Sequence, residues 1–193
     1  MNNKNALLPL VVWLMALAFV AASVFVYYPL IVEVSPVRPP IVFGSGSNAG
    51  QPDLGPANTI TVQLGSNKTS AAITIHPTYN TTYYKNVTII NNTDTKAYNV
   101  SLRVLQAITN FPPGSAIELR IYEGGANRTT DSPIATVDLL STGTTYIGSL
   151  SGGRTWEVDV KVYIPQGSSL PSSATARLHL IYTPSDERPP WLP

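Results

Sequence analysis

Apolar and polar residues alternate with a period of two through most of the chain after residue 58. In residues 156–164, for example, every second residue from Trp156 is apolar, and Glu157, Asp159 and Lys161 occupy the positions between. This period turns one side of a β-strand toward a core and the other toward water. The same pattern predicts strands at residues 60–64, 71–75, 83–89, 98–108, 117–121, 135–139, 145–150 and 174–182.

The alternation also predicts which side chains of a strand face water. In residues 98–108 the even-numbered positions are mostly apolar, so Asn99 and Ser101 are predicted to face solvent. The same rule groups the apolar residues of segment 83–89 on the face opposite Asn86. These residues are Tyr83, Val87 and Ile89.

Turn residues separate the predicted strands, including Gly124-Gly125 and Gly152-Gly153, and no convincing amphipathic helix follows residue 28. Many short strands with turns between them are typical of an antiparallel sandwich. The predicted fold is therefore all-β, an antiparallel β-sandwich resembling a jelly roll, over residues 59–184. A Pro-rich tail, residues 185–193, follows it.

A polar start with Lys4 and an apolar stretch over residues 6–28 form the N-terminus. A positively charged start, an apolar stretch and small residues at the cleavage site are together typical of a signal peptide. The residues before Ser23 are small, so cleavage is predicted directly after Ala22 or after Ser23, and residues 1–23 are assigned to the signal peptide. The alternative is an uncleaved membrane anchor, because the stretch is long enough to span a bilayer.

Residues 24–43 form an extended apolar segment, which is predicted to act as a strand although Pro29 interrupts it. Residues 44–58 are rich in Gly, Ser, Asn and Pro and are predicted to be a flexible linker. A strand on a linker can add itself to the sheet of another copy, and we treat this donor strand as a hypothesis. The alternatives are pairing within its own domain and a simple exit from an anchor. Its predicted residues are Val24, Phe25, Val26, Tyr27, Tyr28, Leu30, Ile31, Val32 and Val34, with residues 41–43 as a continuation.

Charged residues make up only 12 % of the chain, and the net charge is +1. Typical soluble domains have about 25 % charged residues, so Ser, Thr and Asn supply the polar surface here. No basic patch is visible, which argues against nucleic acid as a partner. The chain has no cysteine, which excludes disulfides, thiolate metal sites and thiol catalysis.

Six Asn-X-Ser/Thr sequons follow residue 66, roughly twice the number expected by chance. Each accepts an N-glycan only if the chain is exported. The sequons therefore predict a secreted glycoprotein. The acceptor residues are Asn67, Asn80, Asn86, Asn91, Asn99 and Asn127.

No group of residues in the sequence indicates catalysis, a metal or another cofactor. His76 and His179 are predicted to face solvent on the polar sides of their strands. Aromatic residues suggest a sugar-binding face as an alternative, although packing in a core or its rim is the simpler interpretation. They are Tyr79, Tyr83, Tyr84, Tyr98 and Trp156.

Two segments resemble the TasA/camelysin-like biofilm-matrix proteins. Residues 86–103 (NVTIINNTDTKAYNVSLR) are similar to their strand, turn and strand unit, and residues 148–163 to a later loop and strand. The leader and residues 36–49 look like archaeal secreted relatives that include bundling pilins. The resemblance covers residues 59–184. It implies a jelly-roll subunit that polymerises through an N-terminal donor strand, and it implies no catalytic residues.

These observations together predict a structural subunit of an extracellular filament and not an enzyme. Its expected partners are other copies of itself, with other cell-surface or matrix components as a further expectation. Contact with a membrane is expected only through the leader. The alternatives are a membrane-anchored cell-surface glycoprotein and a carbohydrate-binding module.

Overall fold

The computed structural model describes residues 11–15 and 28–187. The chain divides into two compact units, Met1–Val37 and Arg38–Pro193. In the first unit, residues 11–15 are helical and residues 28–37 form neither helix nor strand. Within the described residues, no helix has both the length and the apolar character needed to cross a membrane.

The described part of the second unit contains ten β-strands, each rich in the β-branched and aromatic residues that favour extended backbone. The strands are β1 (Ile41–Ser45), β2 (Thr61–Leu64), β3 (Ala71–Thr74), β4 (Asn80–Asn92), β5 (Tyr98–Gln106), β6 (Ala116–Glu123), β7 (Ala135–Asp138), β8 (Gly143–Leu150), β9 (Thr155–Ile164) and β10 (Arg177–Pro184).

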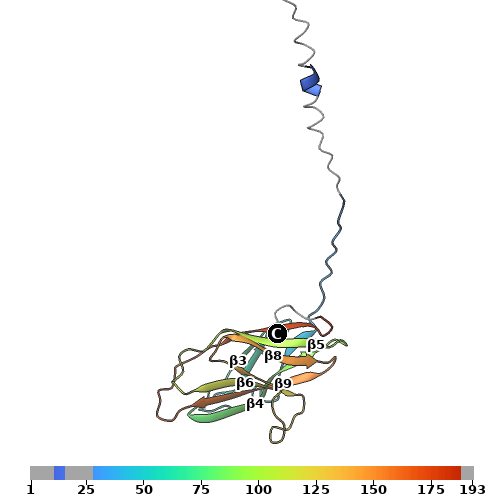
Figure 1. Cartoon of the computed structure of the whole chain (residues 1–193). Helices are drawn as coiled ribbons and strands as arrows, with labels where there is room; N and C mark the ends of the chain where they lie inside the picture. Colours follow the sequence, from blue (N-terminus) through green and yellow to red (C-terminus); the bar gives the residue numbers. More distant parts are fainter. Residues whose placement is uncertain (1–10, 16–27, 188–193) are drawn as a thin grey trace, which may run out of the picture. The chain divides into compact units, whose positions relative to one another are not determined.

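These strands form three antiparallel sheets. A five-stranded sheet has the order β1-β4-β9-β6-β7, a three-stranded sheet has the order β10-β5-β8, and β2 pairs with β3. Figure 1 shows β5 and β8 in one layer and β4, β6 and β9 in the other. The predicted all-β fold, an antiparallel β-sandwich, is confirmed.

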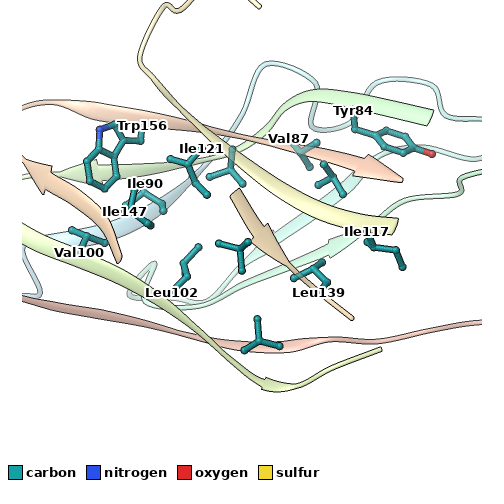
Figure 2. Packing of buried hydrophobic residues seen from close by; sticks show 14 of the residues in the cluster. Tyr84, Val87, Ile90, Val100, Leu102, Ile117, Ile121, Leu139, Ile147 and Trp156 are labelled. Carbon is teal, nitrogen blue, oxygen red and sulfur yellow. The ribbon is translucent and has the colours of Figure 1, made fainter. Parts of the chain in front are cut away.

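The core lies between the two larger sheets and takes one face from each. Alternate residues of β9 from Trp156 to Ile164 are buried, as the period of two predicts. Val100 and Leu102 of β5 are among the buried residues of the opposite sheet. Figure 2 shows Trp156 and Val100 at one end of this core and Tyr84 at the other.

Replacing Trp156 by alanine is expected to lower the free energy of unfolding by about 3–5 kcal/mol, because the change leaves a large cavity. The Trp156 side chain is 1 % exposed. Leu105→Ala is the matched control, since Leu105 lies on β5 but is 43 % exposed, and it is expected to cost under about 1 kcal/mol. Urea unfolding measures both, and equal costs would contradict this assignment of the core.

The segment predicted as a flexible linker belongs to the sandwich, so that prediction is wrong. Residues 41–45, which include the proposed continuation of the donor strand, form β1 and pair with β4 of the same chain. Backbone hydrogen bonds then hold the following loop, from Gly46 N to Val87 O (3.0 Å) and from Gly50 N to Ile60 O (2.7 Å). Glycine and serine make the backbone of this segment flexible in isolation, but these hydrogen bonds fix its conformation in the folded domain.

The faces predicted for residues 83–89 are also wrong, because β4 contains a bulge. Between Tyr84 and Thr88, β4 advances four residues while β9 advances two. Tyr84 and Thr88 therefore share the core side, and Tyr83 lies on the outer side. Asn86 sits inside the bulge with φ +44°, a conformation that asparagine adopts more readily than most residues.

Ser101 was predicted to face solvent, yet it is only 4 % exposed. It is paired with Ile181 of β10 on one side and with Tyr146 of β8 on the other. Residues directly opposite one another in antiparallel strands project from the same face. The two larger side chains therefore cover the small serine on the outer face of the sheet.

Candidate functional site

The described part of the predicted donor strand has no partner strand. Residues 28–34 form no regular structure, and their apolar side chains are exposed, with Leu30 at 87 % and Ile31 at 89 %. Contiguous exposed apolar residues are typical of a segment that binds another surface. Residues 24–27 of the predicted strand and the predicted cleavage residues Ala22 and Ser23 lie outside the described residues.

Strand β10 forms one edge of the three-stranded sheet, and its core-facing side chains are incompletely covered. Leu178, Leu180 and Tyr182 pair with β5 residues that are nearly inaccessible to water. None of the eight residues of β10 is itself buried. The opposite edge strand of the same sheet, β8, differs because its Ile147 and Leu150 are buried.

The edges of the five-stranded sheet are more protected than β10. At β1, the turn of the β2–β3 hairpin covers part of the edge, since Phe43 N donates to Lys68 O at 2.8 Å. At the other edge, β7 has only four residues, and its Val137 is 1 % exposed. Unpaired edges invite strand addition, and short or covered edges resist it. Among the described strands of the two larger sheets, β10 is therefore the best acceptor for an added strand.

A buried ionic cluster lies on the outer face of the five-stranded sheet. Its centre is Asp159, which alternates with core residues of β9 and is 0 % exposed. Arg128, from the loop after β6, binds its carboxylate through Nε and Nη2, both at 2.8 Å. Arg128 Nη2 also donates to Glu157 Oε2 at 2.7 Å, and the guanidinium lies 4.2 Å from the centre of the Tyr122 ring.

Two more donors complete the shell around Asp159, and we call the whole group the Arg128 cluster. The Tyr83 hydroxyl donates to Asp159 Oδ2 at 2.6 Å, and the Asn86 backbone N–H donates to Oδ1 at 2.7 Å. The bulge in β4 is what brings Asn86 to this carboxylate. The cluster consists of Tyr83, Asn86, Tyr122, Arg128, Glu157 and Asp159.

The charges of Asp159 and Arg128 are fixed at neutral pH. Burial by itself raises the pKa of Asp159, but the hydrogen bonds from Arg128, Tyr83 and Asn86 outweigh burial and hold the pKa below the ordinary value of 3.8. Burial and the nearby Asp159 carboxylate raise the pKa of Tyr83. The bonds to Asp159 and Glu157 also raise the pKa of Arg128, against the effect of burial. A general acid or base needs a pKa near the working pH, so these groups suit a structural role.

The lowered pKa of Asp159 predicts how stability depends on pH. A carboxylate with a depressed folded-state pKa contributes stability above its unfolded pKa of about 3.9, and the contribution is lost as the pH falls through the folded value. We expect the melting temperature to fall below about pH 4 and the Asp159→Asn variant to show a weaker acid dependence. Melting curves between pH 2 and 7 measure this, and identical acid slopes for both proteins would contradict it.

A second polar contact fixes the loop after β1. The Asp53 carboxylate accepts the His76 backbone N–H at 2.7 Å and lies 3.0 Å from His76 Nδ1. Burial raises the pKa of Asp53, but bonds from Leu54 and His76 reverse this and lower it. Both histidines were predicted to face solvent. His179 is exposed, whereas the His76 side chain is 38 % exposed and lies against Asp53, so its prediction holds only in part. In residues 11–15 and 28–187, no group of acidic and histidine side chains is placed to hold a metal ion.

The aromatic residues considered as a sugar-binding face do not share an exposed surface. Tyr84, Tyr98 and Trp156 are buried in the core. The Tyr79 hydroxyl donates to Ser168 O at 2.8 Å, and Tyr83 belongs to the Arg128 cluster. Three of the five rings therefore cannot be offered to a sugar.

The six sequon asparagines differ in their surroundings. Asn67, Asn80 and Asn127 are exposed, and the others are partly buried. Asn91 Oδ1 accepts the Thr155 hydroxyl at 3.0 Å, and Asn99 Oδ1 accepts the Tyr146 hydroxyl at 3.1 Å. Asn86 Oδ1 is buried without a hydrogen-bond partner. The sequence motif alone does not distinguish these sites.

Comparison with known proteins finds no matching family model and no matching curated protein. The resemblance to the TasA/camelysin-like proteins therefore stays a prediction from sequence. The exposed N-terminal segment and the edge of β10 are the two features of the described chain that bear on function.

Proposed function

We propose that this chain is a structural subunit of an extracellular filament. The donor strand of one copy, residues 24–34, adds to the edge of β10 in the next copy. The observation that supports this most directly is that one chain contains both an exposed, unpaired apolar segment and an incompletely covered edge strand. Strand addition would pair the exposed segment with a strand and would cover the open edge of β10.

The alternation within the donor segment suggests which side chains are inserted. In an extended strand, Leu30, Val32 and Val34 project to one side, and Ile31 and Glu33 project to the other. The first group is wholly apolar and suits the core side of β10. Each inserted side chain contributes about 1.5–3 kcal/mol on full burial. Hydrogen bonds between the main chains add to this and are largely independent of sequence.

The connection between donor and domain is shorter than the sequence suggested. Pro40 O accepts the Thr93 N–H at 2.8 Å, so the chain is fixed to the domain immediately before β1. Six residues, 35–40, separate Val34 from Ile41. They span at most about 20 Å when extended, and three of them are proline. A donor on this connection requires neighbouring domains to lie close together in the filament.

The geometry of such contacts favours an open polymer. Donor and acceptor are different surfaces of the chain, so each contact is heterologous and leaves one free donor and one free acceptor. Repetition of the contact builds a fibre unless the rotation closes a ring. No cofactor is required for this function.

The absence of cysteine in the natural sequence makes cross-linking a sharp test. One preparation would carry Val32→Cys, and others would carry cysteine at position 178, 180 or 182 of β10. After mixing, assembly and oxidation, we expect a disulfide between Val32→Cys and at least one β10 position. Leu105→Cys is the control, because that side chain is exposed on β5 and away from the sheet edge. Cross-linking to position 105 alone, or to none of the β10 positions, would contradict the proposed contact.

A further inference from the structure

Two sequons lie in turns that present both the asparagine and the threonine to water. Asn67 lies in the turn between β2 and β3, and Asn127 lies in the loop between β6 and β7. Both asparagines and both sequon threonines, Thr69 and Thr129, are exposed. Asn67 Oδ1 accepts the Thr69 N–H at 3.2 Å, and Asn127 Oδ1 accepts the Thr129 N–H at 3.0 Å. Because the Oδ1 atom of each asparagine is bonded to the backbone of its own turn, the Nδ2 atom of the same side chain is directed away from the turn.

The Arg128 cluster anchors the second of these turns. Arg128 stands between Asn127 and Thr129, and its side chain, 11 % exposed, is bound to Asp159 and Glu157. The Asn127 backbone N–H donates to Asp131 Oδ2 at 2.7 Å. The turn is therefore anchored to the sheet by the Arg128 side chain, while the Asn127 side chain stays exposed on the surface.

The sequon at Asn86 has the opposite environment. Its backbone donates to Asp159, and its carbonyl accepts the Asn48 N–H at 3.1 Å. The Asn86 Oδ1 atom is buried. Gly46 packs so closely against it that a Cβ atom at position 46 would lie only 2.6 Å from this oxygen. The sequon hydroxyl of Thr88 is also inaccessible, since it donates to Gly44 O at 2.7 Å.

Asn99 shares one of these restrictions. The hydroxyl residue of its sequon is Ser101, which is 4 % exposed between the larger side chains of Ile181 and Tyr146. An enzyme that recognises the hydroxyl residue of a sequon cannot reach it in the folded domain. Asn80 is exposed but its sequon threonine, Thr82, is partly buried, and Asn91 is itself partly buried, so neither is assigned.

We propose that Asn67 and Asn127 are the N-glycan acceptors of the folded domain, and that Asn86 and Asn99 carry no glycan. Asn86 instead serves the bulge of β4 and the Arg128 cluster. The inference rests on the export of the chain that the proposed function assumes, but it does not depend on polymerisation.

The transfer itself requires a lipid-phosphate-linked oligosaccharide as the donor substrate. A bond forms between the asparagine Nδ2 and the anomeric carbon of the first sugar. The bond between that carbon and the phosphate oxygen of the donor breaks, and its electron pair leaves with the lipid phosphate. Nδ2 loses one proton, which the transferase or water accepts.

Glycopeptide mass spectrometry of the full chain, purified from outside the producing cells, tests the assignment. We expect glycans on the peptides with Asn67 and Asn127 and none on those with Asn86 and Asn99. The variants N67Q and N127Q should each remove the mass of one glycan. The matched control N86G should leave the total glycan mass unchanged, because glycine adopts the positive φ of this position freely.

A glycan on Asn86 or Asn99, or bare Asn67 and Asn127 in the exported chain, would overturn the inference. Deletion of residues 28–34 tests the glycan assignment separately from the proposed filament function. That deletion should abolish filaments and leave both glycans in place. Filaments with bare Asn67 and Asn127 would contradict the glycan assignment alone, and a glycosylated full chain that never polymerises would contradict the filament alone.

Discussion

Val32→Asp is expected to abolish filament formation, whereas Ile31→Asp is expected to permit it. Val32 lies on the wholly apolar side of the donor segment, and Ile31 lies on the side that already carries Glu33. Losing a buried valine costs about 1.5–3 kcal/mol, and an unpaired buried carboxylate adds several kcal/mol to that. Since each 1.4 kcal/mol is a factor of ten, association should weaken by at least a hundredfold. Electron microscopy and sedimentation of each variant measure this.

The two variants also provide the control for folding. Residues 28–37 belong to a compact unit separate from Arg38–Pro193, so neither change should alter the melting temperature of the β-sandwich measured in monomers. Normal filaments from Val32→Asp would contradict the proposed insertion. Loss of filaments in both variants would show that the segment is needed but that its predicted orientation is wrong.

The second large effect is expected at Arg128. Arg128→Ala should lower the free energy of unfolding by about 3–5 kcal/mol, because it leaves the fully buried Asp159 carboxylate without its cationic partner. For a domain of this size, we expect the melting temperature to fall by roughly 10 °C. Thermal unfolding at neutral pH measures the change.

The control for this variant is another ion pair on the same sheet. Glu118 and Arg120 also form a salt bridge, at 2.9 Å, but their side chains are 25 % and 27 % exposed. Glu118→Gln should therefore cost less than about 1 kcal/mol. Equal losses in the two variants would mean that the buried position of the Arg128 cluster is unimportant.

The fold could be predicted from sequence because alternation controls burial directly. In β9, apolar residues recur at every second position and all of them lie in the core. The weakest predicted strand, residues 145–150, lies within the eight-residue β8. Its Ile147 and Leu150 are buried, whereas Thr144, Tyr146 and Ser149 are exposed. The period of two was thus enough to find strands, although not always their ends.

The prediction failed where the chain departs from a regular strand. The bulge in β4 changes which of its residues face the core, and no residue pattern in segment 83–89 announces it. Residues 44–45 continue β1, although glycine and serine in this stretch suggested a linker. Their strand is stabilised by pairing with β4, more than forty residues later in the sequence. Long-range pairing of this kind overrides local propensity.

The Arg128 cluster could not be predicted for a related reason. Asp159 alternates with core residues and therefore looked like an ordinary surface acid. Its partner comes from a loop 31 residues earlier in the chain. The available signal was an arginine within a loop of small and polar residues, which is too common to identify a buried ion pair. The edge of β10 needed the structure as well, since its apolar alternation resembles that of a covered strand.

The most direct test of the proposed function is cryo-electron microscopy of cell-surface material, combined with sequencing of the protein's N-terminus. The account predicts filaments of this chain that begin at Ser23 or Val24, with the first residues of each copy paired to β10 of the next. A monomer that retains Met1 in the membrane would contradict it and favour an anchored surface glycoprotein. Filaments in which the edge of β10 stays unpaired would contradict the proposed contact.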